Sequence, residues 1–551
     1  MTTLEHRAEG PVRPPERIPF PVVDEISRHC LQEEEPETVH IEVHLPGHLD
    51  RDRLRAAFNE ALRRHPRILM REAAGRWYRR RYEWELTADP DMEVVTFLPP
   101  SRDALRDART RALAEAPPLT ASPPIRLEVV EGAGAGAGPV EGSEATDAVG
   151  EPAAAAGSGA GSGAGRGNAH ASAVAAGSGT HHPAAADSRA GRDDAHPSSG
   201  VDATAATAVP TAAASAASAA AAGSRAAGAA RVGAAAPGQR RPAPQPPSSN
   251  AGHSKGTVLF LTINHTALDG PACLRVLATA AELYSGRDNS PAASPIRATQ
   301  PPPHPEETPS NWSPPARVAP GTPEPSPGNG MLVTELPLPH RPKGSPYTVN
   351  DQLMVATALM ISHWNREHGE HPRPLRITMP VDDRPRDTTM PIGNGTRLVE
   401  VPFTPDELNP TDMPALLSRT ATRTRALKSL PRPQLGHGAT LLTAPVTPVS
   451  WRAALTRTLR RAAAPWTSTT LLSNIGRIPY PLDFGEEAGR AHAVWFSAPA
   501  RMPRGLTVTT ASTAGRLHLA LRWSHALLSH GDGAHLRDLF EHYLHTTEVA
   551  P

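Results

Sequence analysis

The sequence TVLFLTINHTALDG, residues 257–270, passes from an apolar run to a polar turn and then to the beginning of a helix. Its first part, 257–263, is short and rich in β-branched and aromatic residues, as expected of a buried strand. The D-G-P sequence at 269–271 is a start signal for a helix, and Gly286 ends that helix. We therefore predict that His265 lies on a rigid loop where a strand ends.

His265 and Asp269 are four positions apart, which suits a histidine that acts as a base. A free imidazole has a pKa of about 6.5, so its neutral form takes a proton from an alcohol or amine near physiological pH. A carboxylate four residues on can hold such a loop by pairing with a cation or with backbone N–H groups. The alternative interpretation is that Asp269 only caps the next helix and His265 is a polar loop residue.

The stretch 264–270 resembles the H-H-x-x-x-D-G signature of the condensation-domain and CoA-dependent acyltransferase superfamily, with Asn264 in place of the first histidine. Other segments similar to the family's motifs follow in the family's order, at 19–25, 47–54, 63–66, 348–353, 380–386, 392–394 and 473–477. So many matches in the right order are not expected by chance. The resemblance implies an α/β fold of two chloramphenicol-acetyltransferase-like subdomains in a V-shaped arrangement, with the active site in the tunnel between them.

The resemblance also implies transfer of an acyl group from a thioester to an alcohol or amine. His265 matches the second histidine of the motif and would remove the acceptor's proton during attack on the thioester carbonyl. Asp269 matches the motif aspartate, whose role is mainly structural, through an ion pair with an arginine. Arg384 is the expected partner, and the alternative is that Arg384 is an ordinary surface residue. Gly270 would allow close approach of the backbone where the loop enters the helix.

Three further residues belong to the expected site. Asn264 would have a supporting role, since an amide still donates and accepts hydrogen bonds. Ser473 and Asn474 match the family's S-N-x-G turn beside the tunnel and would donate hydrogen bonds to the substrate or to the developing oxyanion. The alternative for this pair is an Asx-type turn with no contact to substrate. Asn264 leaves open whether the protein is active.

The composition limits the partners and the compartment. The chain has 56 basic and 56 acidic residues, so net charge gives no reason to expect nucleic acid or anionic membrane as a general partner. Cys30 and Cys273 are too few for a disulfide framework, and Cys273 is interpreted as a small packing residue. We find no signal-peptide pattern and no membrane-spanning stretch. A cytoplasmic monomer without stable membrane insertion is therefore expected.

Two stretches of biased composition divide the chain. Residues 132–256 are dominated by Ala, Gly and Ser and lack the large apolar side chains that offset chain entropy, so we predict a disordered insertion. Residues 287–330 are proline-rich, which indicates an extended linker. The N-terminal subdomain would comprise 16–131 together with 257–286, and the C-terminal subdomain 331–551. Loop-closure cost rises only logarithmically with length, so the insertion need not prevent its flanking strands from pairing.

Hydrophobic periodicity predicts the elements of both subdomains. Helices are expected near 50–65, from Thr348 or Asn350 onward, near 413–430 and from Ala534 to His545, and strands near 125–130, 257–263, 375–379, 397–401, 468–472, 506–510 and 517–523. The sequence from Ser529 to Gly533 is interpreted as a turn before the last helix.

The leading hypothesis is a stand-alone acyltransferase of secondary-metabolite or lipid biosynthesis. Its donor would be acyl-CoA or an acyl-phosphopantetheine carrier protein, used as co-substrate, and its acceptor a small molecule. No bound cofactor is expected, and the adjacent His181 and His182 make a poor metal site. Two alternatives stay open: a wax-ester or diacylglycerol type O-acyltransferase, and a catalytically inactive condensation-like docking protein that binds carrier proteins.

Overall fold

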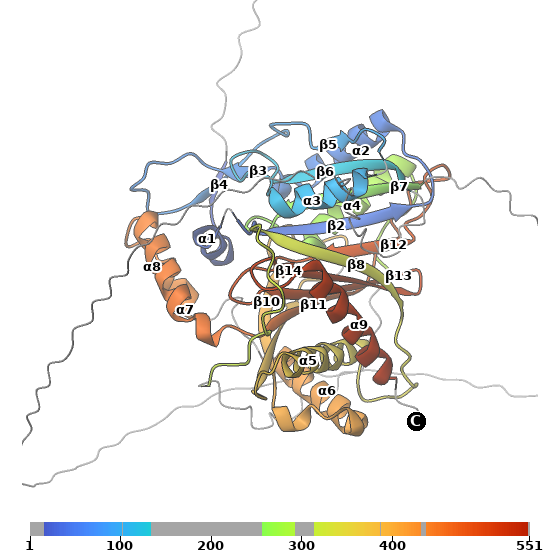
Figure 1. The fold of residues 1–551 in the computed structure, drawn as a ribbon. Coiled ribbons are helices and arrows are strands. Elements are labelled where there is room, and N and C mark those ends of the chain that lie inside the picture. The colour runs from blue at the N-terminus through green and yellow to red at the C-terminus, as the bar shows by residue number, and fades with distance from the viewer. Residues whose placement is uncertain are drawn as a thin grey trace, which may run out of the picture. The chain divides into compact units, whose positions relative to one another are not determined.

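A computed structural model of the chain describes residues 16–32, 34–101, 103–133, 256–292, 313–385, 387–430 and 437–548. These residues form two large mixed sheets with covering helices, shown in Figure 1, so the predicted α/β class is confirmed. The interior of the predicted insertion, 134–255, lies outside the described residues, and so do 293–312 of the predicted linker.

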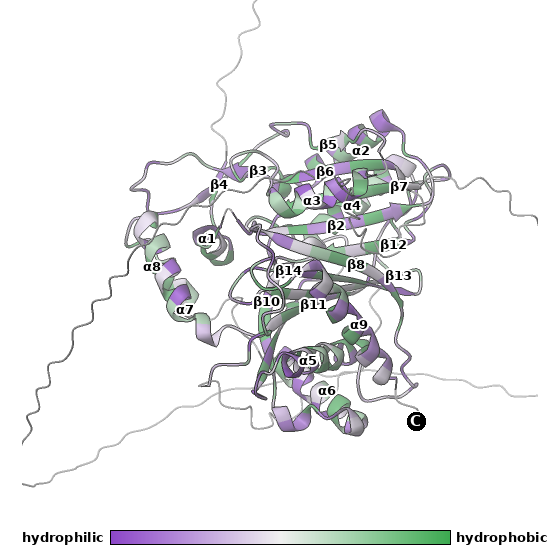
Figure 2. Ribbon diagram, in the orientation of Figure 1, coloured by the Kyte–Doolittle hydropathy of each residue, from purple (hydrophilic) through white to green (hydrophobic). Residues whose placement is uncertain are grey.

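The first sheet has five strands and is built mainly by the N-terminal half. Its strands in spatial order are β12 (Ala493–Ser497), β2 (Thr38–Leu45), β7 (Gly256–Asn264), β6 (Ile125–Ala133) and β5 (Val95–Phe97). Every residue of β7 is buried, because helices cover both faces of the sheet. The covering helices are α2 (Arg51–Arg64), α4 (Gly270–Ser285) and α3 (Ala104–Ala114). A strand buried on both faces carries a continuous apolar run, which is the pattern of 257–263, and Figure 2 shows that hydrophobic character along β7.

The strands that flank the insertion are antiparallel neighbours. Ile125 lies opposite Ile263 at one end of the β6–β7 pair, and Ala133 lies opposite Gly256 at the other. The register shifts once, between Glu131 and Ala133. The chain therefore leaves and re-enters the sheet at adjacent points, as a hairpin would.

The second sheet has six strands and belongs to the C-terminal half. Its strands in spatial order are β10 (Thr396–Phe403), β9 (Leu375–Asp382), β11 (Thr470–Arg477), β13 (Leu506–Thr513), β14 (Arg516–Ser524) and β8 (Asn329–Pro337). The helices α5 (Val349–Glu367), α6 (Met413–Ser429) and α9 (His530–Thr546) pack on it. Thr348 and Asp351 form a capping box at the start of α5. Of the two candidate cap residues, Thr348 and Asn350, the N-cap is therefore Thr348.

The last helix begins earlier than the sequence indicated. Ser529 caps α9 by accepting from the N–H of Asp532, whose carboxylate in turn accepts from the N–H of Ser529. The predicted turn at 529–533 is therefore the cap and first turn of α9. Gly533 is needed for packing, because a Cβ there would lie 2.4 Å from Trp523 Cη2.

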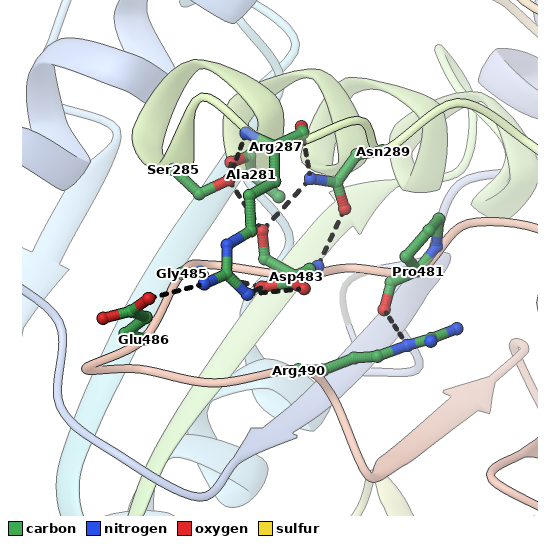
Figure 3. A network of polar contacts seen from close by, with 9 residues as sticks. All are labelled: Ala281, Ser285, Arg287, Asn289, Pro481, Asp483, Gly485, Glu486 and Arg490. Carbon is green, nitrogen blue, oxygen red and sulfur yellow. Dashed lines mark hydrogen bonds and ion pairs between the residues drawn. The ribbon is translucent and has the colours of Figure 1, made fainter.

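One strand crosses between the two halves. β12 comes from the C-terminal half but pairs with β2, so that Val494 lies opposite Val43 in the first sheet. The preceding loop is tied to the end of α4, as Figure 3 shows: Asp483 accepts from Arg287 and Asn289. The subdomain boundaries predicted from the sequence placed 493–497 in the C-terminal subdomain. In the structure this strand belongs to the sheet of the N-terminal half and joins the two halves.

The part of the proline-rich segment that the structure describes is packed against the second sheet. Val318 and its neighbours Ala316 and Ala319 are buried in the core of the C-terminal half. The indole of Trp364 donates to the carbonyl of Ala319. Residues 313–328 therefore act as part of the C-terminal half, in contrast to the extended linker that their proline content indicated.

A smaller group of elements lies beside the two large sheets. It contains the three-stranded sheet β1 (Arg17–Pro19), β4 (Glu83–Leu86) and β3 (Met70–Glu72), and the helices α1 (Val22–His29), α7 (His437–Leu442) and α8 (Val449–Ala462). In Figure 1, α7 and α8 are drawn in orange next to α1, and both contact α1. The helices α7 and α8 were not among the elements predicted from the sequence.

Candidate active site

A cavity of about 420 Å³ lies among elements of both halves of the chain. His265 lies on its wall at the loop between β7 and α4, and Ser473 lies on its wall in β11. The wall also contains apolar side chains, among them Ile26 of α1 and Phe496 of β12. Of the predicted site residues, the cavity wall includes His265, Asp269, Gly270, Ser473 and Asn474, but not Asn264 or Arg384.

His265 is held by its own loop in a single tautomer. Its backbone N–H donates to the carbonyl of Glu37 (2.9 Å), and its Nδ1 lies 3.0 Å from the carbonyl oxygen of Leu268. A carbonyl oxygen only accepts hydrogen bonds, so Nδ1 carries the proton. Nε2 of the neutral ring therefore carries the lone pair, and the half-buried imidazole is arranged to accept a proton at that atom.

Asp269 anchors the loop and does not hydrogen-bond to the imidazole. Its Oδ1 accepts from the N–H of Ala272 (3.0 Å), which caps α4. Its Oδ2 accepts from Arg384 (2.7 Å) and from the N–H of Gly395 (2.9 Å). The side chain is only 3% exposed. Asp269 thus joins the loop of His265 to the second half of the chain.

Arg384 lies between two carboxylates and is 10% exposed. Besides Asp269, its guanidinium donates twice to Asp382, at 2.9 Å to each carboxylate oxygen. It also donates to the carbonyl of Gly393 (3.0 Å). Burial disfavours the charged guanidinium, but the hydrogen bonds of Asp382 and the charge of Asp269 outweigh burial and raise the pKa of Arg384. Arg384 therefore stays cationic and buried, not a surface arginine.

Two residues to which the sequence gave no role hold the same loop. Asn394 Nδ2 donates to the carbonyl oxygens of His265 (3.3 Å) and Thr266 (3.1 Å) and to Asp24 (2.9 Å). Asp24 accepts a second hydrogen bond from the indole of Trp84 (2.8 Å). Burial raises the pKa of Asp24 to about 6 in spite of these bonds. Both residues lie in segments that resemble the family's motifs, Asn394 in 392–394 and Asp24 in 19–25, although neither was given a role.

Asn264 is buried and lies away from the cavity wall. Its Nδ2 donates to the carbonyl of Pro117 (2.9 Å), and its Oδ1 accepts from the N–H of Thr266 (3.1 Å). The first bond ties the turn to the segment that contains Pro117, and the second lies within the turn. The amide therefore supports the position of His265 without facing the space where a substrate would lie.

Ser473 and Asn474 differ in what they can offer a ligand. Asn474 Oδ1 accepts from the N–H of Gly476 (2.9 Å), which is the Asx-type geometry, and its Nδ2 donates to Asn350 (3.2 Å). The sequence S-N-I-G lies inside β11, where the register shifts between Asn474 and Gly476, rather than in a separate turn. Ser473 and Asn474 both line the cavity.

The start of α4 is packed against β12. A Cβ on Gly270 would lie 3.1 Å from two ring carbons of Phe496, so glycine permits this close approach. Cys273 is fully buried, and burial followed by the charge of Asp269 raises the pKa of its thiol. Cys273 is therefore a packing residue in the first core.

The strand-turn-helix unit of His265 occurs a second time in the fold. His525 follows β14 and precedes α9, as His265 follows β7 and precedes α4. In both turns the fourth residue after the strand end donates its N–H to the carbonyl of the strand's last residue, Asn264 or Ser524. His525 does not line the cavity; its Nε2 lies 3.4 Å from Glu324.

Across the described ranges, no group of three or more His, Cys, Asp or Glu side chains is placed to hold a metal ion. Within the same residues, no helix has the length and apolar character needed to cross a membrane.

No family model matches the chain. Two uncharacterised proteins of Mycobacterium tuberculosis, from strains CDC 1551 and H37Rv, are each 34% identical to it over 165 residues. The match covers 29% of the chain and 37% of each relative, so it spans little more than a third of the relatives' length.

Solved structures resemble the whole chain at low identity. The trichothecene 15-O-acetyltransferase TRI3 of Fusarium sporotrichioides has a TM-score of 0.50 at 10% identity, over 97% of this chain and 96% of that one. The first condensation domain of the CDA synthetase has a TM-score of 0.49 at 11% identity, over 98% of each chain. The likeness to TRI3 shows that the chain has the fold of that acetyltransferase, an α/β fold as the motif at 264–270 implied.

Proposed function

We propose that this protein is an acyltransferase that moves an acyl group from a CoA or carrier-protein thioester to an alcohol or amine. The observation that carries the proposal is the position of His265. Its Nδ1 is committed to the carbonyl of Leu268, and the ring lies on the wall of the cavity, so Nε2 is the basic atom available to a substrate.

In the proposed reaction Nε2 of His265 takes the proton of the acceptor as the acceptor oxygen or nitrogen attacks the thioester carbonyl. The carbon–sulfur bond then breaks, and the thiolate takes the same proton from the imidazolium. The bond from Nδ1–H to Leu268 is strengthened while the ring is charged, because the donor then belongs to a cation. One histidine thus acts as base and then as acid, with no covalent acyl-enzyme.

Ser473 is our candidate for contact with the substrate or the oxyanion. Ser473 lines the cavity, and its hydroxyl forms no hydrogen bond with another of the described residues. Asn474 is assigned to the support of β11, since its amide is bonded to Gly476 and Asn350.

The inactive docking protein is the competing hypothesis. It depended on Asn264 and on the large insertion. The amide of Asn264 is bonded to the carbonyl of Pro117 and to the N–H of Thr266, and Asn264 does not line the cavity. The replacement of the first motif histidine therefore leaves His265 in place, and this supports the enzyme over the inactive relative. Apolar side chains such as Ile26, Leu274 and Phe496 on the cavity wall suit an acyl chain or a lipid acceptor, which keeps the wax-ester and diacylglycerol class within the proposal.

The test is a thiol-release assay with a panel of acyl-CoA and acyl-carrier donors and of alcohol and amine acceptors. His265→Ala should lower turnover by about 10²–10⁴-fold, the usual contribution of a general base. His525→Ala is the matched control, because it removes a histidine from the equivalent turn outside the cavity, and it should keep turnover within a fewfold of wild type. Equal turnover by wild type and His265→Ala, or binding of carrier protein with no turnover, would overturn the proposal.

A further inference from the structure

The helix α8 presents an apolar face to solvent. Trp451, Leu455 and Leu459 follow each other at intervals of four and are 68%, 51% and 44% exposed. Residues four apart lie on one side of a helix. Val446 before the helix and Trp466 after it are also exposed. We refer to these five residues as the α8 apolar face.

The opposite side of α8 is buried and carries the polar Arg452 and Thr456 beside the small apolar Val449 and Ala453, so the largest apolar side chains of this helix face solvent. Arg452 forms an ion pair with Glu25 of α1 (2.6 Å), and both side chains are almost fully buried. Thr456 hydrogen-bonds to His29 of α1 (3.3 Å). The helix is therefore fixed to α1 by polar contacts, and its orientation toward solvent is set by those contacts rather than by loose packing.

The stretch of sequence that contains this face carries formal charge of one sign. The sequence 413–482 contains no Asp or Glu, and Arg457 and Arg461 are exposed on α8 itself. In Figure 2, α8 carries both hydrophobic and hydrophilic residues. A neighbouring loop repeats the pattern: Trp77 is exposed beside exposed basic residues, and the N–H of Val449 donates to the carbonyl of Arg79 in that loop.

We propose that the α8 apolar face docks on an anionic membrane surface. Basic helices with Trp and Leu on one face lie in the interface plane, with the apolar side chains among the acyl chains and the arginines near the headgroups. Trp at both ends of the face suits the headgroup level, and anionic lipids complement the single sign of charge. The zero net charge of the whole chain does not indicate this, because the acidic residues lie elsewhere in the sequence.

The proposed contact lies next to the cavity. Arg460 at the end of α8 and Thr467 after it belong to the cavity wall, as does Ile26 of α1, the helix that carries α8. If the proposed acyl transfer is correct, docking would bring an acyl donor or acceptor held in the bilayer close to the cavity. The docking itself does not rest on that activity.

The test is co-sedimentation of the full chain with vesicles of phosphatidylcholine alone and with added phosphatidylglycerol. Wild type should bind the anionic vesicles about tenfold or more tightly than the neutral ones, with weaker binding at high salt. The triple variant W451S/L455S/L459S and the charge variant R457E/R461E should each lose about tenfold or more. Both alter exposed side chains, so an unchanged melting temperature checks that they fold.

The matched control is the double variant M92S/L338S, which removes two exposed apolar side chains elsewhere on the described surface and should bind like wild type. The proposal is overturned if wild type does not bind anionic vesicles or if the triple variant binds as well as wild type. It is also overturned if the face instead binds an acidic carrier protein or a second copy of the chain. That result would be a complex or a dimer that the triple variant fails to form, together with no binding of wild type to vesicles. None of these outcomes depends on acyl transfer.

Discussion

Removing Arg384 should destabilise the protein more than removing the charge of its partner Asp269. Arg384→Met leaves the carboxylates of Asp269 and Asp382 near each other without their shared cation. Removing one partner of a buried ion pair costs about 3–5 kcal/mol in the free energy of unfolding. Asp269→Asn leaves Arg384 paired with Asp382, and an asparagine still caps α4, so we expect a cost of about 1–3 kcal/mol.

The double variant carries neither charge of this pair, so its cost should be smaller than the sum of the single costs, with a coupling of about 0.5–3 kcal/mol. Urea unfolding followed by tryptophan fluorescence measures these values, provided that the slope with denaturant stays constant among the variants. Arg516→Met is the matched control. Arg516 pairs with Glu335 at the same N–O distance, 2.7 Å, but both side chains are exposed. Such surface pairs contribute about 0–1 kcal/mol.

The reasoning is refuted if Arg384→Met costs no more than Arg516→Met, or if the single costs of Asp269→Asn and Arg384→Met add without coupling. Either result would mean that burial and the shared carboxylates do not make this pair different from one on the surface. His265 would then need another explanation for its fixed position.

Two further predictions concern pH and the insertion. Because burial raises the pKa of Asp24 from 3.8 to about 6, the folded state binds this proton more tightly than the unfolded state, and the resulting stability is lost as pH rises through about 6. The contribution of Asp24 to the free energy of unfolding should fall by about 1.4 kcal/mol between pH 5 and pH 8. The variant Asp24→Asn should remove that part of the pH dependence of unfolding. If the pH dependence is unchanged in this variant, the raised pKa of Asp24 is contradicted. Replacing 134–255 by an Asn-Gly turn should leave the melting temperature undiminished, since Ala133 already lies opposite Gly256; a large drop would show that the removed segment stabilises the core.

The elements that the sequence predicted well are those whose pattern is local. β7 was expected at 257–263 and spans Gly256–Asn264, because a strand buried on both faces is apolar throughout. Asp269 and Gly286 mark the two ends of α4, through a cap on Ala272 and a left-handed C-cap. Such signals depend on residues within one turn of the helix, so they are readable without the fold.

The elements that the sequence missed depend on distant partners. The start of α9 was interpreted as a turn, but Ser529 caps the helix, and Gly533 makes room for the ring of Trp523. β12 is short and joins the sheet of the other half through β2. α8 shows its apolar face to solvent because Arg452 is paired with Glu25 far along the chain. Local pattern carries no information about these partners.

The two histidine turns separate the contributions of sequence and fold. The sequence specified both turns, since each follows a buried strand and ends at a side chain that caps a helix, Asp269 or Ser529. It did not specify which histidine would face a cavity. His265 does so because Arg384, Gly395 and the other elements of the second half close around its loop, whereas His525 lies against Glu324. Hydrogen bonds between neighbours in sequence fix a turn, but only packing between distant segments makes the space in which a base can act.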